Sequence, residues 1–167
     1  PHFVDRLRND GKNCDYFKIG FDQRILSKTI QNNRDIDFSF MGGISKHHSN
    51  ASKNIEYLIK NAKLQVYGYG AKNLPYNSKI RKNHKGERWG LDMYNILSRT
   101  KISFNRHINV AENNANNMRL YEATGMGSLL LTDKKDNLKK LFEEDREIVT
   151  YKSKEEALHK YNYLINN

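Results

Sequence analysis

Hydrophobic positions recur along the chain with two different spacings, and the two spacings predict different elements. Residues 36–40 alternate apolar and polar side chains, which is typical of a strand. Residues 129–131 form a continuous leucine run, which favours a strand covered on both faces. The apolar residues of 55–62 recur three and four positions apart, which is the spacing of one helix face. By these criteria the predicted strands are residues 15–19, 36–40, 64–70, 101–105, 129–131 and 147–150, and the predicted helices are 2–9, 55–62, 91–97, 117–125, 138–142 and 153–165.

Strands and helices alternate about five times along the chain. This order predicts an α/β fold, a Rossmann-like parallel sheet with helices on both faces. Residues 73–89 follow neither spacing and concentrate positive charge. We expect this segment to be a solvated loop or a cover over an anionic ligand, with contact to an anionic acceptor or nucleic acid as the third interpretation. Its cations are Lys79, Arg81, Lys82, Lys85 and Arg88.

The predicted helix 117–125 has recognisable signals at both ends. Asn116 or Asn117 can cap its first turn, because an Asn side chain satisfies amide donors that the turn leaves free. Gly125 and Gly127 fit a left-handed stop, where a Cβ atom would be strained.

The same helix carries candidate binding groups. Free amides and the helix dipole attract a phosphate, and Asn116, Asn117 and Arg119 lie at that end. Glu122 follows one turn later and can accept hydrogen bonds from sugar hydroxyls. The pattern therefore favours a phosphorylated sugar ligand. The alternative is an ordinary βα unit in which Arg119 and Glu122 are solvated charges.

Further candidates follow the predicted strands, where ligands bind in open α/β sheets. Gly42 and Gly43 form a turn that lets backbone amides approach a phosphate, although they lack the Gly-x-Gly-x-x-Gly spacing of nicotinamide-dependent oxidoreductases. Tyr69 is placed to stack on a base, or equally to fill the core. Arg106 and His107 end another strand and could reach a diphosphate.

Composition narrows the function classes. The 167 residues carry a net charge of +10, which makes an anionic ligand, acceptor or surface more plausible than a neutral one. The single cysteine, Cys14, excludes an internal disulfide and a cysteine-based zinc site, and the adjacent His47 and His48 suit a solvated loop better than a metal site. No apolar run is long enough to span a bilayer. We therefore expect a cytoplasmic chain without a bound metal, with peripheral contact at the inner face of the membrane left open.

A family resemblance enters at residues 118–127, Met-Arg-Leu-Tyr-Glu-Ala-Thr-Gly-Met-Gly, which run into Leu-Leu-Leu-Thr-Asp. This motif resembles the nucleotide-sugar-binding helix of GT-B glycosyltransferases, and more narrowly the CgeB-like (spore-maturation protein) family. The runs 105–107 and 111–114 are also similar to that family, while Gly20-Phe21-Asp22 resembles the GT-B interdomain linker. The broader retaining pattern has a second Glu eight positions before Glu122, where this chain has Asn114.

The resemblance implies a glycosyltransferase that takes a sugar from a nucleoside-diphosphate donor, without a metal cofactor and with retention of configuration. Glu122 matches the Glu that binds the donor ribose. Residues 1–33 would be the tail of an N-terminal domain and the linker, and residues 34–167 the donor-binding domain. Because the chain begins with Pro1, we expect a fragment or a processed chain. The acceptor (glycan, protein or lipid-linked) and the catalytic residues stay open, and the alternative function is a basic α/β module that binds nucleic acid or another polyanion.

Overall fold

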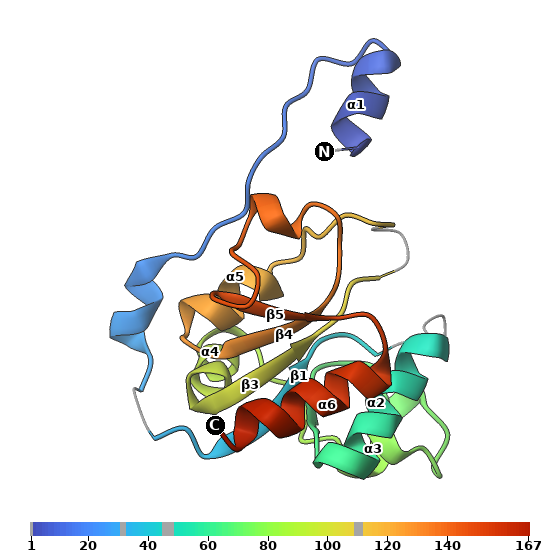
Figure 1. Ribbon diagram of the computed structural model, residues 1–167, viewed down its shortest axis with the longest axis vertical. Helices are drawn as coiled ribbons and strands as arrows, with labels where there is room; N and C mark the ends of the chain where they lie inside the picture. Colours follow the sequence, from blue (N-terminus) through green and yellow to red (C-terminus); the bar gives the residue numbers. More distant parts are fainter. Residues whose placement is uncertain (1, 31–32, 45–48, 109–111) are drawn as a thin grey trace.

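The computed structural model describes residues 2–30, 33–44, 49–108 and 112–167, which contain one five-stranded, wholly parallel sheet (Figure 1). Its strands lie in the order β2-β1-β3-β4-β5. Their bounds are β1 (Ile36–Met41), β2 (Gln65–Tyr67), β3 (Thr100–Asn105), β4 (Leu129–Asp133) and β5 (Ile148–Tyr151). His47, His48 and Ala111, which entered the predictions above, lie outside the described residues.

Helices cover both faces of the sheet, as the sequence predicted. On one face α2 (Ser49–Ala62), α3 (Lys79–Asn83) and α6 (Lys154–Ile165) pack over a core that includes Phe38, Phe104 and Leu131. On the other face α4 (Gly90–Arg99) and α5 (Arg119–Gly125) pack over Leu130 and Ile148. Successive side chains of a strand point to opposite faces, so the leucine run of β4 serves both cores. The α/β, Rossmann-like fold is thus confirmed.

The direction of the crossovers changes between the two central strands. From β1 the chain passes through α2 to β2 on one side, whereas from β3 it passes through α5 to β4 on the other side. The carboxyl ends of β1 and β3 therefore lie next to each other with their following loops leading apart. In open α/β sheets such a switch point is where ligands bind.

The two glycines predicted to end α5, Gly125 and Gly127, have different roles. Gly127 has φ of +72° and its amide donates to the Thr124 carbonyl at 2.8 Å, as in a left-handed C-terminal cap. Gly125 is still helical, and the expectation of a left-handed Gly125 is wrong. A Cβ on Gly125 would lie 2.3 Å from the Phe21 ring, so this glycine makes room for the segment that enters the domain.

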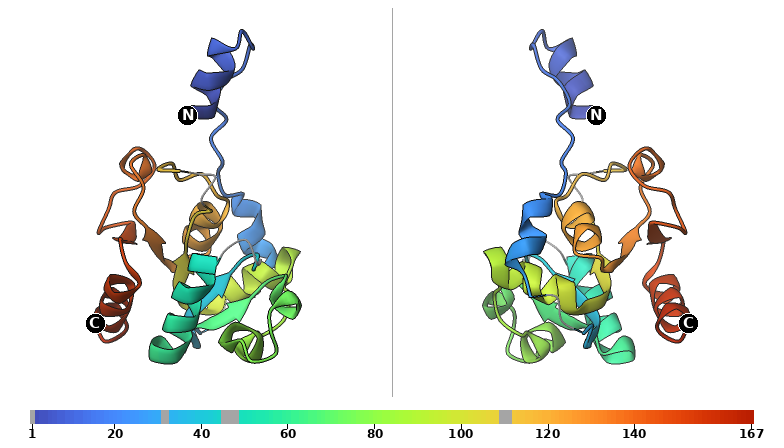
Figure 2. Two further views of the ribbon diagram at one scale, coloured as in Figure 1. Left: turned by 90° about the vertical axis from the view of Figure 1, so that its right-hand side faces the viewer. Right: turned by 90° about the vertical axis from the view of Figure 1, so that its left-hand side faces the viewer.

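The N-terminal segment lies apart from the sheet. Figures 1 and 2 both show α1 (His2–Asn9) separated from the main body, joined to it by an extended stretch that leads to the 3-10 helix η1 (Gln23–Lys28). The strand predicted over residues 15–19 is wrong, because no described strand pairs with this stretch and Phe17 is 85 % exposed. The domain boundary after residue 33 stays a prediction.

Residues 73–89 are more ordered than an irregular loop. They include the end of the 3-10 helix η2 (Ala71–Asn73) and all of α3, whose Ile80 is fully buried. Beyond α3 the chain runs beside β2, where Lys85 N donates to the Val66 carbonyl at 2.8 Å and Gly68 N donates to the Gly86 carbonyl at 3.1 Å. The segment therefore covers the free edge of β2, which an exposed strand edge requires.

Candidate functional site

A pocket of about 520 Å³ opens at the carboxyl ends of β1 and β3. Its walls come from the loops after these two strands, from the start of α4 and from α5. Nine residues were predicted to bind a ligand, and six of them line this pocket: Gly42, Gly43, Arg106, Asn117, Arg119 and Glu122. The remaining three, Tyr69, His107 and Asn116, do not line it. The ligand-binding role of all nine stays a prediction, but the fold brings most of them together from segments far apart in sequence.

The glycine turn after β1 is fixed by its neighbour β2. Gly42 N donates to the Tyr67 carbonyl at 3.1 Å, so this amide is already used. A Cβ on Gly43 would lie 2.6 Å from the Tyr69 ring, and one on Gly68 would lie 2.2 Å from the Gly42 carbonyl oxygen. Close packing of the two loops therefore explains these glycines, and no described residue accepts a hydrogen bond from Gly43 N. That amide is the one in the turn suited to an external acceptor.

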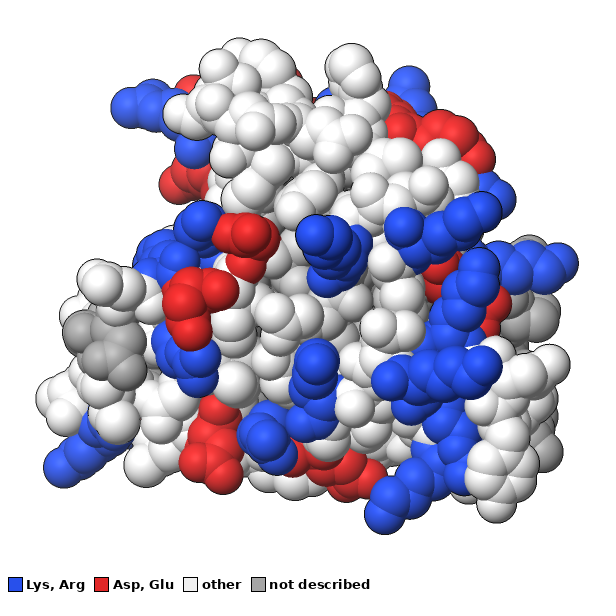
Figure 3. Space-filling model, turned by 90° about the horizontal axis from the view of Figure 1, so that it is seen from below, with Lys and Arg blue, Asp and Glu red and all other residues white. Residues whose placement is uncertain are grey.

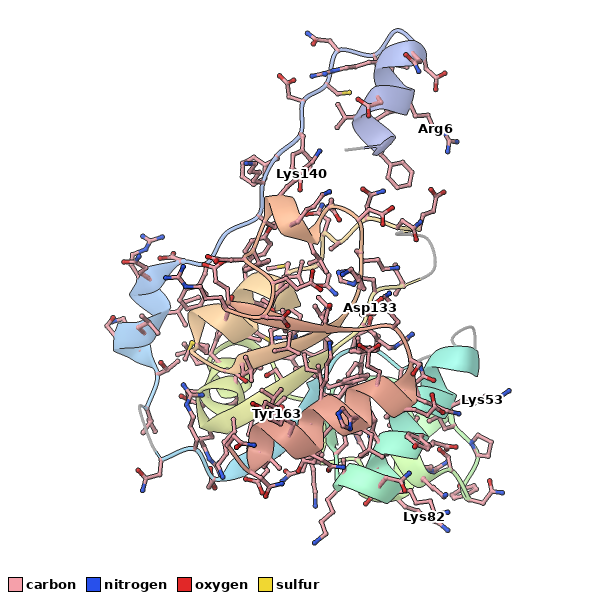
Figure 4. All side chains as sticks on the ribbon, viewed as in Figure 1. Arg6, Lys53, Lys82, Asp133, Lys140 and Tyr163 are labelled. Carbon is pink, nitrogen blue, oxygen red and sulfur yellow. The ribbon has the colours of Figure 1, made fainter. Side chains whose placement is uncertain are left out.

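Arg106 and His107, adjacent after β3, have opposite environments. Asp133 at the end of β4 accepts from the backbone N of His107 at 2.9 Å and lies 2.7 Å from its Nδ1. The imidazole is buried, and its Nε2 has no partner among the described residues. Figure 4 shows Asp133 at this end of the sheet, and its side chain is partly exposed. His107 thus anchors the loop and does not face the pocket.

Asp133 is held as a carboxylate by this contact. Burial acts to raise its pKa, but the hydrogen bond and charge of His107, together with the charge of Lys135, bring the pKa below the usual value. Lys135 Nζ lies 3.6 Å from Asp133 Oδ2. The ionised Asp133 therefore ties the loop after β3 to the end of β4.

Arg106 lines the pocket with a partly buried guanidinium. Burial lowers its pKa. The neighbouring Tyr151 and Asp133 act in the opposite direction without cancelling this change. Its Nε atom is buried without a hydrogen-bond partner, and Arg106 makes no ion pair with any described residue. An arginine stays charged in proteins, so the pocket contains a partly buried cation that forms no ion pair with the described residues.

Arg119, in contrast, is fully engaged. Its Nη1 lies 2.9 Å from Glu122 Oε2, both side chains being largely buried. Its Nε donates to the Met41 carbonyl at 3.2 Å, and its Nη1 lies 3.3 Å from the sulfur of Met93. Burial lowers the pKa of Arg119, and the charge of Glu122 opposes that change. Arg119 therefore links α5 to the end of β1 and positions Glu122.

The two asparagines before α5 differ as well. Asn117 Oδ1 accepts from Leu120 N at 3.3 Å, which is the predicted cap, and its Nδ2 donates to Asn105 Oδ1 at 3.1 Å. Asn117 therefore joins the start of α5 to the end of β3 at the pocket floor. Asn116 Oδ1 instead accepts from the Tyr16 hydroxyl at 3.3 Å, outside the pocket.

Aromatic residues form the remaining wall, and none of those that line the pocket was predicted as a binding residue; the predicted Tyr69 lies beside one of them. Trp89 lines the pocket and stacks on Tyr69 with ring centroids 5.7 Å apart and 16° between the planes. Both rings are more than half exposed. Tyr94, on the next turn of α4, reaches Glu122 Oε1 at 3.4 Å, and burial followed by the charge of Glu122 raises its pKa. The sequence signal that could have identified Trp89 is an aromatic residue between a basic segment and the start of a predicted helix.

The part of the chain that the structure describes contains no group of three or more His, Cys, Asp or Glu side chains that could hold a metal ion. Within the same residues, no helix has both the length and the apolar composition needed to cross a membrane.

Fold and site together define a Rossmann-like α/β domain with a cationic, aromatic-walled ligand pocket at its switch point. Residues 45–167 match the family model described as "Glycosyl transferase-like". The chain belongs to this glycosyl transferase-like family.

A comparison with solved structures supports the fold through AviGT4. AviGT4, a glycosyltransferase involved in avilamycin A biosynthesis, superposes with a TM-score of 0.64 at 14 % identity, over 93 % of this chain and 49 % of that one. The pneumococcal O-GlcNAc transferase GtfA, solved with UDP and GlcNAc, gives 0.47 at 15 % identity, over 81 % and 29 %. This chain thus spans about half the length of AviGT4. A sequence search of curated proteins gave no match.

Proposed function

We propose that this chain is the donor-binding half of a CgeB-like glycosyltransferase and that its pocket binds a nucleoside-diphosphate sugar. The observation that carries the proposal is Arg106, a partly buried pocket cation without an ion-pair partner among the described residues. A diphosphate supplies the negative charge that this guanidinium lacks, and the planar fork of arginine matches phosphate oxygens. Membership of the glycosyl transferase-like family supports the same ligand class.

The other pocket residues then take complementary roles. Glu122 accepts hydrogen bonds from the ribose hydroxyls, and Arg119 holds it in place through the 2.9 Å ion pair. The exposed Tyr69–Trp89 stack offers a flat apolar surface for the base. The Gly43 amide and Arg106 face the diphosphate, where they stabilise the charge that develops as the sugar–phosphate bond breaks.

Transfer itself requires more than this pocket. We propose that the acceptor binds to a second domain, as expected if the whole enzyme has the length of AviGT4. The proposed reaction uses no metal cofactor and retains the configuration of the sugar, and the acceptor is a glycan, a protein or a lipid-linked sugar. On this proposal the chain alone binds the donor without transferring it.

The test is a thermal-shift titration with UDP, GDP, ADP and a mixed oligonucleotide on the wild type, on Glu122→Gln and on Glu143→Gln. Glu143 is an exposed control whose ion pair with Arg146 lies on the surface. A ligand at 100 times its dissociation constant adds about 2.7 kcal/mol, which is readily measured as a shift in Tm. We expect one nucleoside diphosphate to stabilise the wild type and Glu143→Gln, and Glu122→Gln to lose most of the response. Stabilisation by the oligonucleotide alone would refute the proposal.

A further inference from the structure

The positive charge of the chain is concentrated in one stretch. Residues 53–88 contain nine Lys and Arg against two Glu, an excess of seven within the net charge of +10. This stretch forms most of α2, strand β2, η2 and α3. Its charge is therefore distributed over adjacent elements on one side of the molecule and not along a flexible tail.

These cations gather on one face, which we call the α2–α3 basic face. Helices α2 and α3 pack against each other, and Arg81 Nη1 donates to the Lys72 carbonyl at 3.2 Å, which brings η2 beside α3. Figure 3 shows basic side chains in a nearly continuous band on the side where α2 and α3 lie, and Figure 4 shows Lys53 and Lys82 extending away from the body. The face consists of Lys53, Lys60, Lys72, Lys79, Arg81 and Lys82.

The charges of this face are not neutralised within the protein. None of its six side chains makes an ion pair with any residue that the structure describes. Elsewhere surface cations do pair, as in Lys101–Asp37 at 2.6 Å and Lys160–Glu156 at 3.1 Å. Glu56, the one acid between α2 and α3, is used instead by the Ser78 hydroxyl at 2.9 Å and the backbone N of Lys79 at 3.2 Å.

A single aromatic ring projects from the basic face. Tyr76 follows Pro75 in the turn before α3 and is 83 % exposed. The Arg81 guanidinium lies 3.8 Å from the centroid of its ring, so a cation–π contact holds the ring in place. A tyrosine with an apolar body and a polar tip suits the headgroup layer of a bilayer, where one end is apolar and the other wet.

We propose that the α2–α3 basic face docks on an anionic lipid bilayer, with Tyr76 in the headgroup layer. Five of its six cations are lysines, which act as point charges and suit the diffuse field of anionic headgroups. A nucleic-acid surface would use several exposed rings for stacking or arginine forks on phosphates. Here Tyr76 is the exposed ring of the face. Its one arginine, Arg81, already contacts the Tyr76 ring and donates to backbone carbonyls.

The basic face and the pocket are joined by a short stretch of chain. Residues 84–88 lead from the end of α3 along the β2 edge to Trp89, which stands at the pocket wall. The docking proposal does not depend on the nucleotide site, because its residues are separate from those that line the pocket.

The experiment is vesicle co-sedimentation with phosphatidylcholine alone and with phosphatidylglycerol mixed in, at low and at physiological salt. The face variant is the triple Lys72→Gln, Lys79→Gln and Lys82→Gln. The matched control, Lys12→Gln, Lys18→Gln and Lys28→Gln, removes the same charge from exposed, unpaired lysines of the N-terminal segment. Removal of each lysine should weaken binding about fivefold, and the face triple about a hundredfold, while the control triple leaves vesicle binding close to that of the wild type.

Tyr76→Ser and two further measurements complete the test. Tyr76→Ser should weaken binding to anionic vesicles at both salt concentrations, because loss of buried ring area is not screened by ions. The face triple should keep its nucleotide-induced thermal shift, which separates this proposal from the donor site. The proposal is overturned if the wild type ignores anionic vesicles, if the control triple loses as much binding as the face triple, or if an oligonucleotide outcompetes the vesicles for the face.

Discussion

Replacing Arg106 with methionine should separate ligand binding from stability. The pocket partly buries this guanidinium, whose Nε atom has no partner among the described residues, so the folded protein carries a desolvation cost at that atom. Methionine has a similar length and adapts to irregular space, so it fills the site without the charge. We therefore expect Arg106→Met to weaken binding of a nucleoside diphosphate while the ligand-free protein unfolds no more easily than the wild type.

The two effects differ in sign and in size. Hydrogen bonds to a charged group contribute about 1.5–3 kcal/mol, so the dissociation constant should rise by roughly 10- to 150-fold. Relief of the desolvation cost should add on the order of 1 kcal/mol to the free energy of unfolding, after allowance for the partial exposure of the side chain. An arginine that serves the fold would instead lose stability on this change.

Calorimetric titration with UDP and GDP measures the first effect, and urea denaturation without ligand measures the second. Arg146→Met is the control, because Arg146 is 77 % exposed at the side chain and lies outside the pocket. If Arg106→Met binds nucleotide as tightly as the wild type, Arg106 is not a diphosphate ligand. If it loses both binding and more than about 1 kcal/mol of stability, the reasoning from its missing partner is refuted.

Three further changes test the fold around the site. Gly125→Ala should cost about 1–3 kcal/mol in urea denaturation, because its Cβ would overlap the Phe21 ring at 2.3 Å, and most of the loss should vanish in the Phe21→Ala background. Asp133→Asn should lower stability most at neutral pH. Its folded pKa is depressed, so its contribution is present above the unfolded value of about 4 and is lost as the pH falls through the folded pKa; urea denaturation at several pH values checks this. Ser153→Ala should cost about 1 kcal/mol, measured by thermal unfolding, because Ser153 Oγ caps α6 by accepting from Glu156 N at 3.1 Å.

Signals that are local in sequence predicted the structure well. The alternation within β1, the leucine run of β4 and the helical spacing of α2 depend on neighbours three or four positions away at most. Whether such a segment forms a strand or a helix depends on backbone geometry and on which side chains face the core. Both can be read from the local sequence. The loops after parallel strands also meet at one edge for topological reasons, which is why six predicted residues share a pocket.

What the sequence could not predict depends on a distant partner. Residues 15–19 have the composition of a strand, but they have no strand beside them. Gly125 has a spacing that suits a helix stop. The structure requires glycine there for another reason, because a Cβ would overlap the ring of Phe21, over a hundred positions earlier. His107 was assigned to the diphosphate, while Asp133 on the next strand turns it into the interior. In each case a tertiary contact decided between two locally acceptable states.

The two pocket arginines show how far such contacts decide function. Arg119 spends its donors on Glu122, on the Met41 carbonyl and on sulfur, so its charge is cancelled within the protein. Arg106 has no such partner among the described residues, and a neutral ligand would leave its charge unpaired. This difference is the physical reason for proposing an anionic ligand.

Glu122 in turn does not have to release Arg119 in order to bind a ribose. Its Oε2 is held at 2.9 Å, but the Tyr94 hydroxyl approaches Oε1 only to 3.4 Å, well beyond the usual 2.7–2.8 Å of such a bond. Oε1 is therefore the oxygen with capacity left for sugar hydroxyls. Tyr94→Phe should then leave nucleotide affinity within about twofold of the wild type, since it removes only a weak competitor. A loss as large as that of Glu122→Gln in the same calorimetric titration would show that Tyr94 itself holds the ligand.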